Sequence, residues 1–134
     1  LHRLRNMSGD TGEFLGTCSA EVLRQHYREA SAVLLPGEED FGIVPVEALA
    51  CGRPVVALAK GGALETVTDG VSGILVHDTS TSAFADGLLR LSEHSFDPST
   101  IRSKALIFST DRFIERIRKC VKTTMEVAPE DVRW

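Results

Sequence analysis

The chain has 134 residues and a formal net charge of −4, enough for one domain whose core buries roughly two-thirds of the surface of the unfolded chain. Hydrophobic residues at 43% and charged residues at 25% are typical of globular proteins, and the acidic balance argues against a nucleic-acid partner. No segment has the apolar length of a membrane span. The three cysteines fit neither a disulfide framework nor a metal site, so we expect a cytoplasmic protein.

The first part of the chain alternates short apolar runs with helical patterns. Residues 13–16 form a short apolar run that ends in glycine, which predicts a strand. Ser19 is a suitable N-cap for a helix that continues to about residue 30. Residues 32–35 contain no polar side chain and precede Pro36-Gly37, which predicts a strand buried on both faces of a sheet.

The same alternation continues through the middle of the chain. A short helix is expected over residues 44–51, with Pro45 in its first turn and Gly52 as its stop signal. An apolar strand over residues 54–58, a helix over 63–67 and a further strand over 74–76 follow.

The remainder of the chain is predicted to be helical. Phe84, Leu88 and Leu91 form one apolar stripe on a helix that begins near Ser80. A later helix, capped by Ser109 or Thr110, carries a second stripe that we expect to pack in the core, made of Phe113, Ile117, Cys120 and Val121. Residues 126–134 show no periodicity and are expected to be a frayed tail, so the predicted domain covers residues 1–125.

Short apolar strands that alternate with helices predict an α/β fold with a parallel sheet covered on both faces. Ligands of such sheets bind beyond the carboxyl ends of the strands. Glycine-bearing loops lie at three of these ends, over residues 16–19, 37–42 and 60–62, and the ligand is therefore expected there.

Two glutamates, Glu39 and Glu47, stand eight residues apart and enclose the start of the helix at 44–51. On one continuous helix this spacing would leave them about 80° out of line, so we place Glu39 on the loop and Glu47 in the first helical turn. The backbone amides of Gly42, Ile43 and Val44 then face outward at a helix N-terminus, which suits a phosphate. The carboxylates suit hydroxyl groups on either side of it. One alternative is that both are solvated surface carboxylates. A separate alternative is that the acidic loop 38–40 is a hard-cation site, although such loops are more often only solvated.

The segment 39–57 resembles the E-x7-E region of retaining GT-B glycosyltransferases of family 4, also called glycosyl transferases group 1, and in particular its mannosyltransferase-like members. The runs Gly61-Gly62-Ala63-Leu64-Glu65-Thr66-Val67, Asp69-Gly70 and Gly73-Ile74-Leu75-Val76 continue the resemblance in the family's order. Phe14-Leu15-Gly16 fits the strand before the nucleotide-base loop. The resemblance implies a Rossmann-like sheet that forms the incomplete C-terminal half of a GT-B fold.

The resemblance also implies roles for individual residues. Glu47 would bind the ribose of the donor nucleotide, and Glu39 would hold hydroxyls of the transferred sugar as the catalytic residue. The amides of Phe41, Gly42, Ile43 and Val44 would contact sugar and diphosphate. Gly16 and Thr17 would border the base. Lys60 is a candidate phosphate contact, with an exposed surface lysine as the alternative. The family needs neither a metal nor a cofactor, and the chain has no D-x-D pair.

Two features of the family have no counterpart in this sequence. The acceptor-binding domain and the basic residues that clamp the diphosphate precede the segments matched here, and the chain begins at Leu1 as a fragment would. Two strands of the family's sheet would also lie between the 13–16 strand and the 32–35 strand, so we expect the former to be unpaired or displaced.

We therefore expect a hexosyltransferase that takes a nucleoside diphosphate sugar, GDP-mannose ahead of a UDP-hexose, and transfers its sugar with retention. The acceptor would be a glycan or a lipid-linked saccharide bound by the missing N-terminal domain. Peripheral association of the full-length protein with the inner face of a membrane is common in the family. A noncatalytic nucleotide-binding module and a structural interaction domain are the alternatives.

Overall fold

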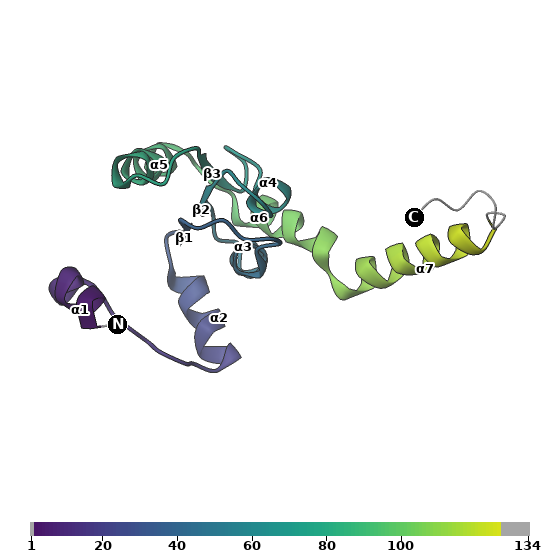
Figure 1. Cartoon of the computed structure of the whole chain (residues 1–134), viewed down its shortest axis with the longest axis horizontal. Helices are drawn as coiled ribbons and strands as arrows, with labels where there is room; N and C mark the ends of the chain where they lie inside the picture. Colours follow the sequence, from purple (N-terminus) through teal and green to yellow (C-terminus); the bar gives the residue numbers. More distant parts are fainter. Residues whose placement is uncertain (1, 127–134) are drawn as a thin grey trace.

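The computed structural model describes residues 2–126, which Figure 1 shows from the N-terminal helix to the long C-terminal one. The predicted tail at 126–134 lies outside the described residues except for Glu126, the last residue of α7. The elements follow in this order: α1 (His2–Ser8), the 3-10 helix η1 (Gly9–Thr11), α2 (Ala20–Glu29), β1 (Val33–Leu35), α3 (Ile43–Ala50), β2 (Val55–Leu58), α4 (Ala63–Thr66), β3 (Gly73–Val76), α5 (Thr81–Glu93), α6 (Pro98–Ala105), the 3-10 helix η2 (Leu106–Phe108) and α7 (Thr110–Glu126).

The three described strands form one parallel sheet in the order β1-β2-β3. Leu35 pairs with Ala57, and Ala57 pairs with Leu75 on its other side. Helices α3 and α4 lie in the two crossovers between neighbouring strands. The predicted parallel α/β fold is confirmed, and the carboxyl ends of β1, β2 and β3 share one edge of the sheet.

Helices cover both faces of this sheet, as predicted. On one face α3 packs against α6, and their side chains join those of the strands in a single core. Leu49 and Ile101 are fully buried within it. The whole cluster contains Leu35, Ala48, Leu49, Val55, Ala57, Ala63, Val67, Ile101 and Ala105.

Helix α5 covers the other face over β2 and β3. Phe84 and Leu91 of the predicted stripe pack against the buried cluster of Val56, Ile74 and Val76, whereas Leu88 is 40% exposed. A Cβ atom at Gly87 would lie 2.8 Å from a methyl carbon of Val76, so α5 approaches the sheet closely at this glycine.

Three serines begin helices at the expected places. The Oγ atoms of Ser19 and Ser80 accept hydrogen bonds from the amides of Val22 and Ala83, each at 3.3 Å. Ser109, rather than Thr110, accepts from the amide of Arg112 at 3.4 Å. These caps satisfy amides that the helices leave without an internal partner.

Strand β1 is not buried on both faces, contrary to the prediction. Leu35 is buried, but Leu34 on the opposite face is 49% exposed. Among the described strands β1 pairs only with β2, and α5 contacts β2 and β3 instead of β1. Because β1 lies at the edge of the described sheet, Leu34 is left uncovered, although its apolar neighbours in sequence suggested full burial.

The predicted strand at residues 13–16 does not form. The chain runs there as an irregular connection between η1 and α2, drawn apart from the sheet in Figure 1. A run of four residues forms a strand only where a neighbour supplies hydrogen-bonding partners. This outcome agrees with the expectation that these residues would be unpaired. Helix α1, in a stretch for which no element was predicted, precedes them.

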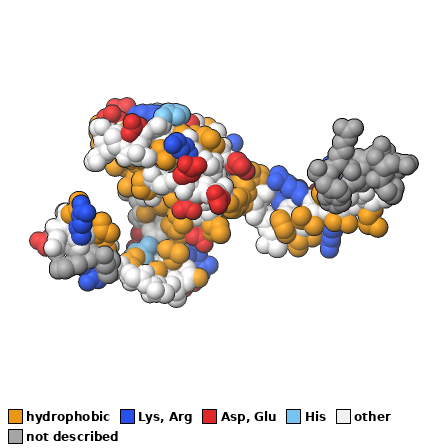
Figure 2. Space-filling view, viewed as in Figure 1, with side chains coloured by type: hydrophobic (Ala, Val, Ile, Leu, Met, Phe, Trp, Pro, Cys, Tyr) orange, Lys and Arg blue, Asp and Glu red, His pale blue; other side chains and the backbone are white. Residues whose placement is uncertain are grey.

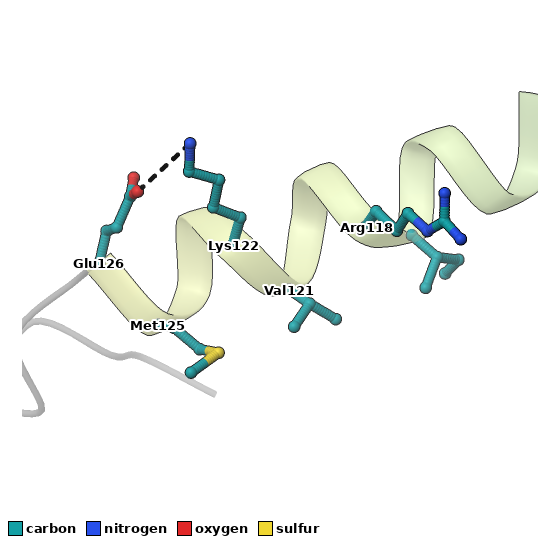
Figure 3. Close-up of a pocket in the computed structure, with 6 residues that line it drawn as sticks. Arg118, Val121, Lys122, Met125 and Glu126 are labelled. Atoms are coloured by element: carbon teal, nitrogen blue, oxygen red, sulfur yellow. Dashed lines mark ion pairs between the residues drawn. The ribbon is translucent and has the colours of Figure 1, made fainter.

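The apolar stripe of α7 does not pack in the core, so this prediction is wrong. Phe113 is 62% exposed, Ile117 48% and Val121 52%. Figure 2 shows hydrophobic side chains along the arm that α7 forms away from the sheet. A shallow hollow on this helix is lined by Val121, Met125, Lys122 and Glu126 among others. Figure 3 shows Val121 and Met125 on the side of the helix opposite the Lys122–Glu126 ion pair. The hollow lies far from the strand ends, where a ligand is expected.

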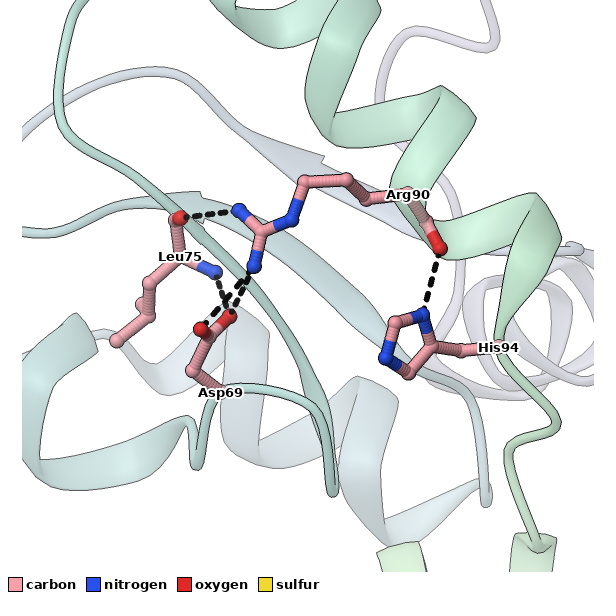
Figure 4. Close-up of polar contacts among 4 residues, drawn as sticks. All are labelled: Asp69, Leu75, Arg90 and His94. Atoms are coloured by element: carbon pink, nitrogen blue, oxygen red, sulfur yellow. Dashed lines mark hydrogen bonds and ion pairs between the residues drawn. The ribbon is translucent and has the colours of Figure 1, made fainter.

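A polar network joins α5 to the start of β3 (Figure 4). Asp69 accepts hydrogen bonds from the amide of Leu75 at 2.8 Å and from the guanidinium of Arg90 at 3.1 Å. Arg90 also donates to the carbonyl oxygen of Leu75. These bonds hold the turn at Asp69-Gly70 against α5. The turn precedes β3 and so lies at the edge of the sheet opposite the carboxyl ends of the strands.

Candidate functional site

Two of the three glycine-bearing loops meet at the carboxyl edge of the sheet. One loop, residues 36–42, follows β1, and the other, residues 59–62, follows β2. The amide of Gly62 donates a 2.7 Å hydrogen bond to the carbonyl oxygen of Glu39. The backbone that carries Glu39 is therefore fixed to the end of β2.

The glycine pair at 61–62 permits this contact. Gly61 has a φ of 52°, and a Cβ atom there would lie 2.3 Å from the carbonyl oxygen of Glu39. A Cβ atom at Gly62 would lie 2.1 Å from the carbonyl oxygen of Phe41. Any larger residue would push the two loops apart, because both clashes are with backbone atoms.

Helix α3 begins at the end of the first loop. Gly42 is its N-cap with a φ of 78°, a conformation that favours glycine, and no side chain caps the helix. Pro45 lacks an amide hydrogen, so Ile43 and Val44 supply the remaining first-turn donors. Uncapped amides and the positive end of the helix dipole favour an anion at this position.

Glu39 and the predicted amides border the same space. A cavity of about 250 Å³ is lined by Glu39, Asp40, Phe41, Gly42, Ile43 and Val44. Glu39 is exposed, as are Phe41 at 46% and Ile43 at 65%. The structure therefore brings together the residues expected to contact the sugar and the diphosphate.

Glu47 lies in a second cavity, between α2 and α3. It is the fifth residue of α3 and so lies just beyond the first turn, in which it was predicted. Tyr27 of α2 donates a 3.1 Å hydrogen bond from its hydroxyl to Oε2 of Glu47. The cavity measures about 340 Å³ and is lined by Ala20, Glu21, Leu23, Arg24, Tyr27, Glu47, Ala50 and Cys51. The helix N-terminus separates the two carboxylates, as the spacing predicted.

Tyr27 is a feature that the sequence did not assign to the site. Burial, together with the hydrogen bond and the negative charge of Glu47, raises the pKa of its hydroxyl to about 12. Tyr27 falls within the helix predicted from Ser19 to about residue 30, and that pattern gave it no polar role. Its pairing with a carboxylate 20 residues away depends on how α2 packs on α3.

The other candidates are placed less centrally. Lys60 is exposed just beyond the end of β2, next to the glycine pair that holds the Glu39 loop. Gly16 has a φ of 66° and, with Thr17, belongs to the extended connection before α2. In Figure 1 this connection runs at a distance from the strand ends, so these two residues do not join Glu39 and Gly42.

An aromatic contact supports the Glu39 loop. The rings of Phe41 and Phe108 meet edge to face with their centroids 5.6 Å apart. Phe108 belongs to η2, so a residue from the C-terminal part of the described chain supports the loop through this ring contact.

Within residues 2–126, no group of three or more His, Cys, Asp or Glu side chains is arranged to hold a metal ion. None of the helices in this range is long and apolar enough to cross a membrane.

Residues 1–94 match the family described as Glycosyl transferases group 1. The chain belongs to this family. The predicted family membership and the GT-B type of α/β fold are thereby confirmed. The match includes both loops, α3 and the glutamate pair.

Several relatives are D-inositol 3-phosphate glycosyltransferases. The protein of that name from Geodermatophilus obscurus is 37% identical over 110 residues, which are 81% of this chain and 24% of the relative. The one from Mycolicibacterium gilvum is 42% identical over 109 residues, 77% of this chain and 24% of the relative. The chain thus spans about a quarter of the length of these relatives.

Solved structures show the same fold. Sucrose-phosphate synthase from Thermosynechococcus elongatus superposes with a TM-score of 0.72 and 26% identity, over 95% of this chain and 35% of that one. HepE from Anabaena, solved in complex with UDP, gives a TM-score of 0.68 and 30% identity, over 94% of this chain and 36% of that one. HepE has also been solved with UDP-glucose.

Proposed function

We propose that this chain is the donor-binding part of a glycosyltransferase that transfers a hexose from a nucleoside diphosphate sugar, with retention of configuration. The observation that carries the proposal is the uncapped N-terminus of α3, which lies between Glu39 and Glu47 in a chain of the Glycosyl transferases group 1 family. An anion-binding helix N-terminus, flanked by two carboxylates that accept hydrogen bonds from hydroxyls, fits the diphosphate, the sugar and the ribose of a sugar nucleotide.

The diphosphate is assigned to the amides of Gly42, Ile43 and Val44. These donors point out of a helix N-terminus and make no side-chain cap bond, so an anion can take them without displacing another group. Lys60, exposed on the loop after β2, is the candidate cation for the diphosphate. The acidic side chains of the 36–42 loop repel a free anion. This favours a ligand whose negative charge lies at the N-terminus of α3 itself.

Glu39 is assigned to the sugar and Glu47 to the ribose. A carboxylate accepts hydrogen bonds from hydroxyls, and each glutamate is exposed in its own cavity on one side of the helix N-terminus. We assign the role during transfer to Glu39, whose backbone is held by the hydrogen bond from Gly62.

A UDP-hexose is the donor to test first. The resemblance over residues 39–67 suggested GDP-mannose, but HepE is 30% identical and has been solved with UDP-glucose. The D-inositol 3-phosphate glycosyltransferases and sucrose-phosphate synthase name phosphorylated polyols and sugars, and none names mannose. We keep GDP-mannose as the competing donor. The acceptor remains a glycan or a lipid-linked saccharide bound outside this chain.

In the proposed reaction the bond between the anomeric carbon and the diphosphate breaks, and a new bond to an acceptor hydroxyl oxygen forms on the same face. The hydroxyl proton leaves with the departing diphosphate or with solvent. The contribution of this chain is to orient the sugar through Glu39 and to stabilise the growing negative charge through the α3 amides.

Isothermal titration of the full chain with UDP, UDP-glucose, GDP and GDP-mannose tests the proposal. We expect one nucleotide base to be preferred and Glu47→Gln to weaken that ligand by about tenfold, because a hydrogen bond to a charged group is lost. Glu93→Gln, on the exposed surface of α5, is the matched control and should bind as the unmodified chain does. Equal binding by both variants would refute the assignment of Glu47.

A further inference from the structure

We propose that Tyr27 is a positioning residue for Glu47, which it holds in the orientation that receives the ribose hydroxyls of the donor nucleotide. This inference rests on the proposed function and adds to it a residue outside the E-x7-E segment.

The geometry makes Tyr27 the donor and Glu47 the acceptor. The hydroxyl lies 3.1 Å from Oε2, a distance typical of a hydrogen bond. The ring is partly buried and packs against the core cluster that contains Ala48 and Leu49 of α3. Because the core fixes the ring, the hydroxyl is presented to Glu47 from a rigid support.

The protonation state of Tyr27 suits this role. Its pKa is raised to about 12 by burial first, and then by the hydrogen bond and charge of Glu47. The hydroxyl therefore keeps its proton throughout the physiological range and remains a donor.

Glu47 needs such a support. Its side chain is exposed and has three rotatable bonds, so ordering it on binding costs conformational entropy. The bond to Oε2 fixes the carboxylate in advance and uses one of its acceptor positions. Among the described residues only Tyr27 donates a hydrogen bond to this carboxylate. Oε1 and the second lone pair of Oε2 are therefore left to accept from the two hydroxyls of a ribose in the cavity that Glu47 lines.

Tyr27→Phe removes the hydroxyl and keeps the ring that packs in the core. Its affinity for UDP is compared with its affinity for 2′,3′-dideoxyuridine diphosphate, which lacks both ribose hydroxyls. We expect Tyr27→Phe to weaken UDP about three- to tenfold, the worth of one hydrogen bond to a charged group, and to leave the dideoxy analogue unchanged. A purely structural role would weaken both ligands by the same factor, and that result would overturn the proposal.

The double variant Tyr27→Phe/Glu47→Gln provides an independent readout. If Tyr27 acts through Glu47, the double variant should bind UDP no more weakly than Glu47→Gln alone. Additive losses would contradict the inference. Circular dichroism of each variant confirms that the helix content is unchanged.

These results separate the inference from the function it rests on. If the unmodified chain and all variants bind UDP and its dideoxy analogue equally well, the donor-site proposal fails. The role of Tyr27 then fails with it. If Glu47→Gln loses the preference for UDP over the dideoxy analogue while Tyr27→Phe keeps it, only the role of Tyr27 is wrong.

Discussion

Gly62 and Glu39, from loops that follow two different strands, are joined by a backbone hydrogen bond of 2.7 Å. The bond forms because neither Gly61 nor Gly62 has a side chain to hold the loops apart. It fixes the loop that carries the proposed sugar contact to the end of the buried strand β2. The position of Glu39 therefore depends on residues that would make no contact with the sugar.

Replacement of Gly62 by alanine should separate these loops. The new methyl group would lie 2.1 Å from the carbonyl oxygen of Phe41, so backbone must move, and we expect a loss of about 1–3 kcal/mol in the free energy of unfolding. Urea denaturation measures this loss. Gly37→Ala is the control, since a Cβ atom at Gly37 meets nothing within 4 Å. Equal stability of the two variants would contradict the tight approach of the loops.

Titration of Tyr27 should report its contact with Glu47. Tyr27 is the only tyrosine in the chain, so the near-ultraviolet absorbance change on ionisation belongs to it alone. We expect a midpoint near 12 in place of the ordinary 10. Glu47→Gln should lower this midpoint but not restore it fully, because burial persists. Since the folded-state pKa is raised, the stabilisation is present below pH 10 and is lost as the pH rises toward 12.

A midpoint near 10 in the unmodified chain, measured while circular dichroism still shows the native helix content, would contradict this contact. Glu21→Gln is the control variant, since Glu21 lines the same cavity and forms an ion pair with Arg24.

Helix α6 should be essential for the core under α3. Ile101 is fully buried between the helices and the sheet, so Ile101→Ala is expected to cost about 2–5 kcal/mol through lost burial and a cavity. Leu106, 61% exposed in η2, is the matched aliphatic control, and Leu106→Ala should change stability by less than about 0.5 kcal/mol. Thermal and urea unfolding of both variants check the difference. Similar values for the two would place α6 outside the core.

The N-cap of α6 should make stability depend on acidic pH. Hydrogen bonds from Ser99 and Thr100 hold the pKa of Asp97 well below its ordinary value of 3.8. A carboxylate of lowered pKa stabilises the fold at neutral pH, and this contribution is lost as the pH falls below about 4. Asp97→Asn can still cap the helix but cannot titrate there. Its melting temperature should therefore fall less steeply between pH 5 and pH 2, and an identical slope would argue against the cap.

Local signals in the sequence were sufficient for most of the fold. Serine caps began α2, α5 and α7, and Gly52, with a φ of 74°, ended α3 where expected. Unbroken apolar residues marked β2, which is buried along its whole length. These features depend on neighbours within a few positions, so they can be read without knowing the tertiary structure.

Features that depend on distant partners could not be predicted in this way. The apolar pattern of Val33 and Leu34 does not reveal that β1 lies at the edge of the described sheet. Likewise, the stripe through Phe113 marks an amphipathic helix without showing whether another element covers it. In the site, Glu39, Gly42 and Glu47 could be proposed from spacing. Tyr27 and Phe108 could not, because each reaches the site through packing between elements.

The central claim is that the N-terminus of α3, together with Glu39 on the loop before it and Glu47 within it, binds a nucleoside diphosphate sugar. A two-dimensional amide NMR spectrum of the full chain, titrated with UDP-glucose and then with GDP-mannose, tests it most directly. The account predicts saturable shifts at Gly42, Ile43, Val44 and Glu47, larger for one donor than for the other, with Leu89 on the exposed face of α5 unmoved. A well-dispersed spectrum in which neither donor shifts these four amides would contradict it.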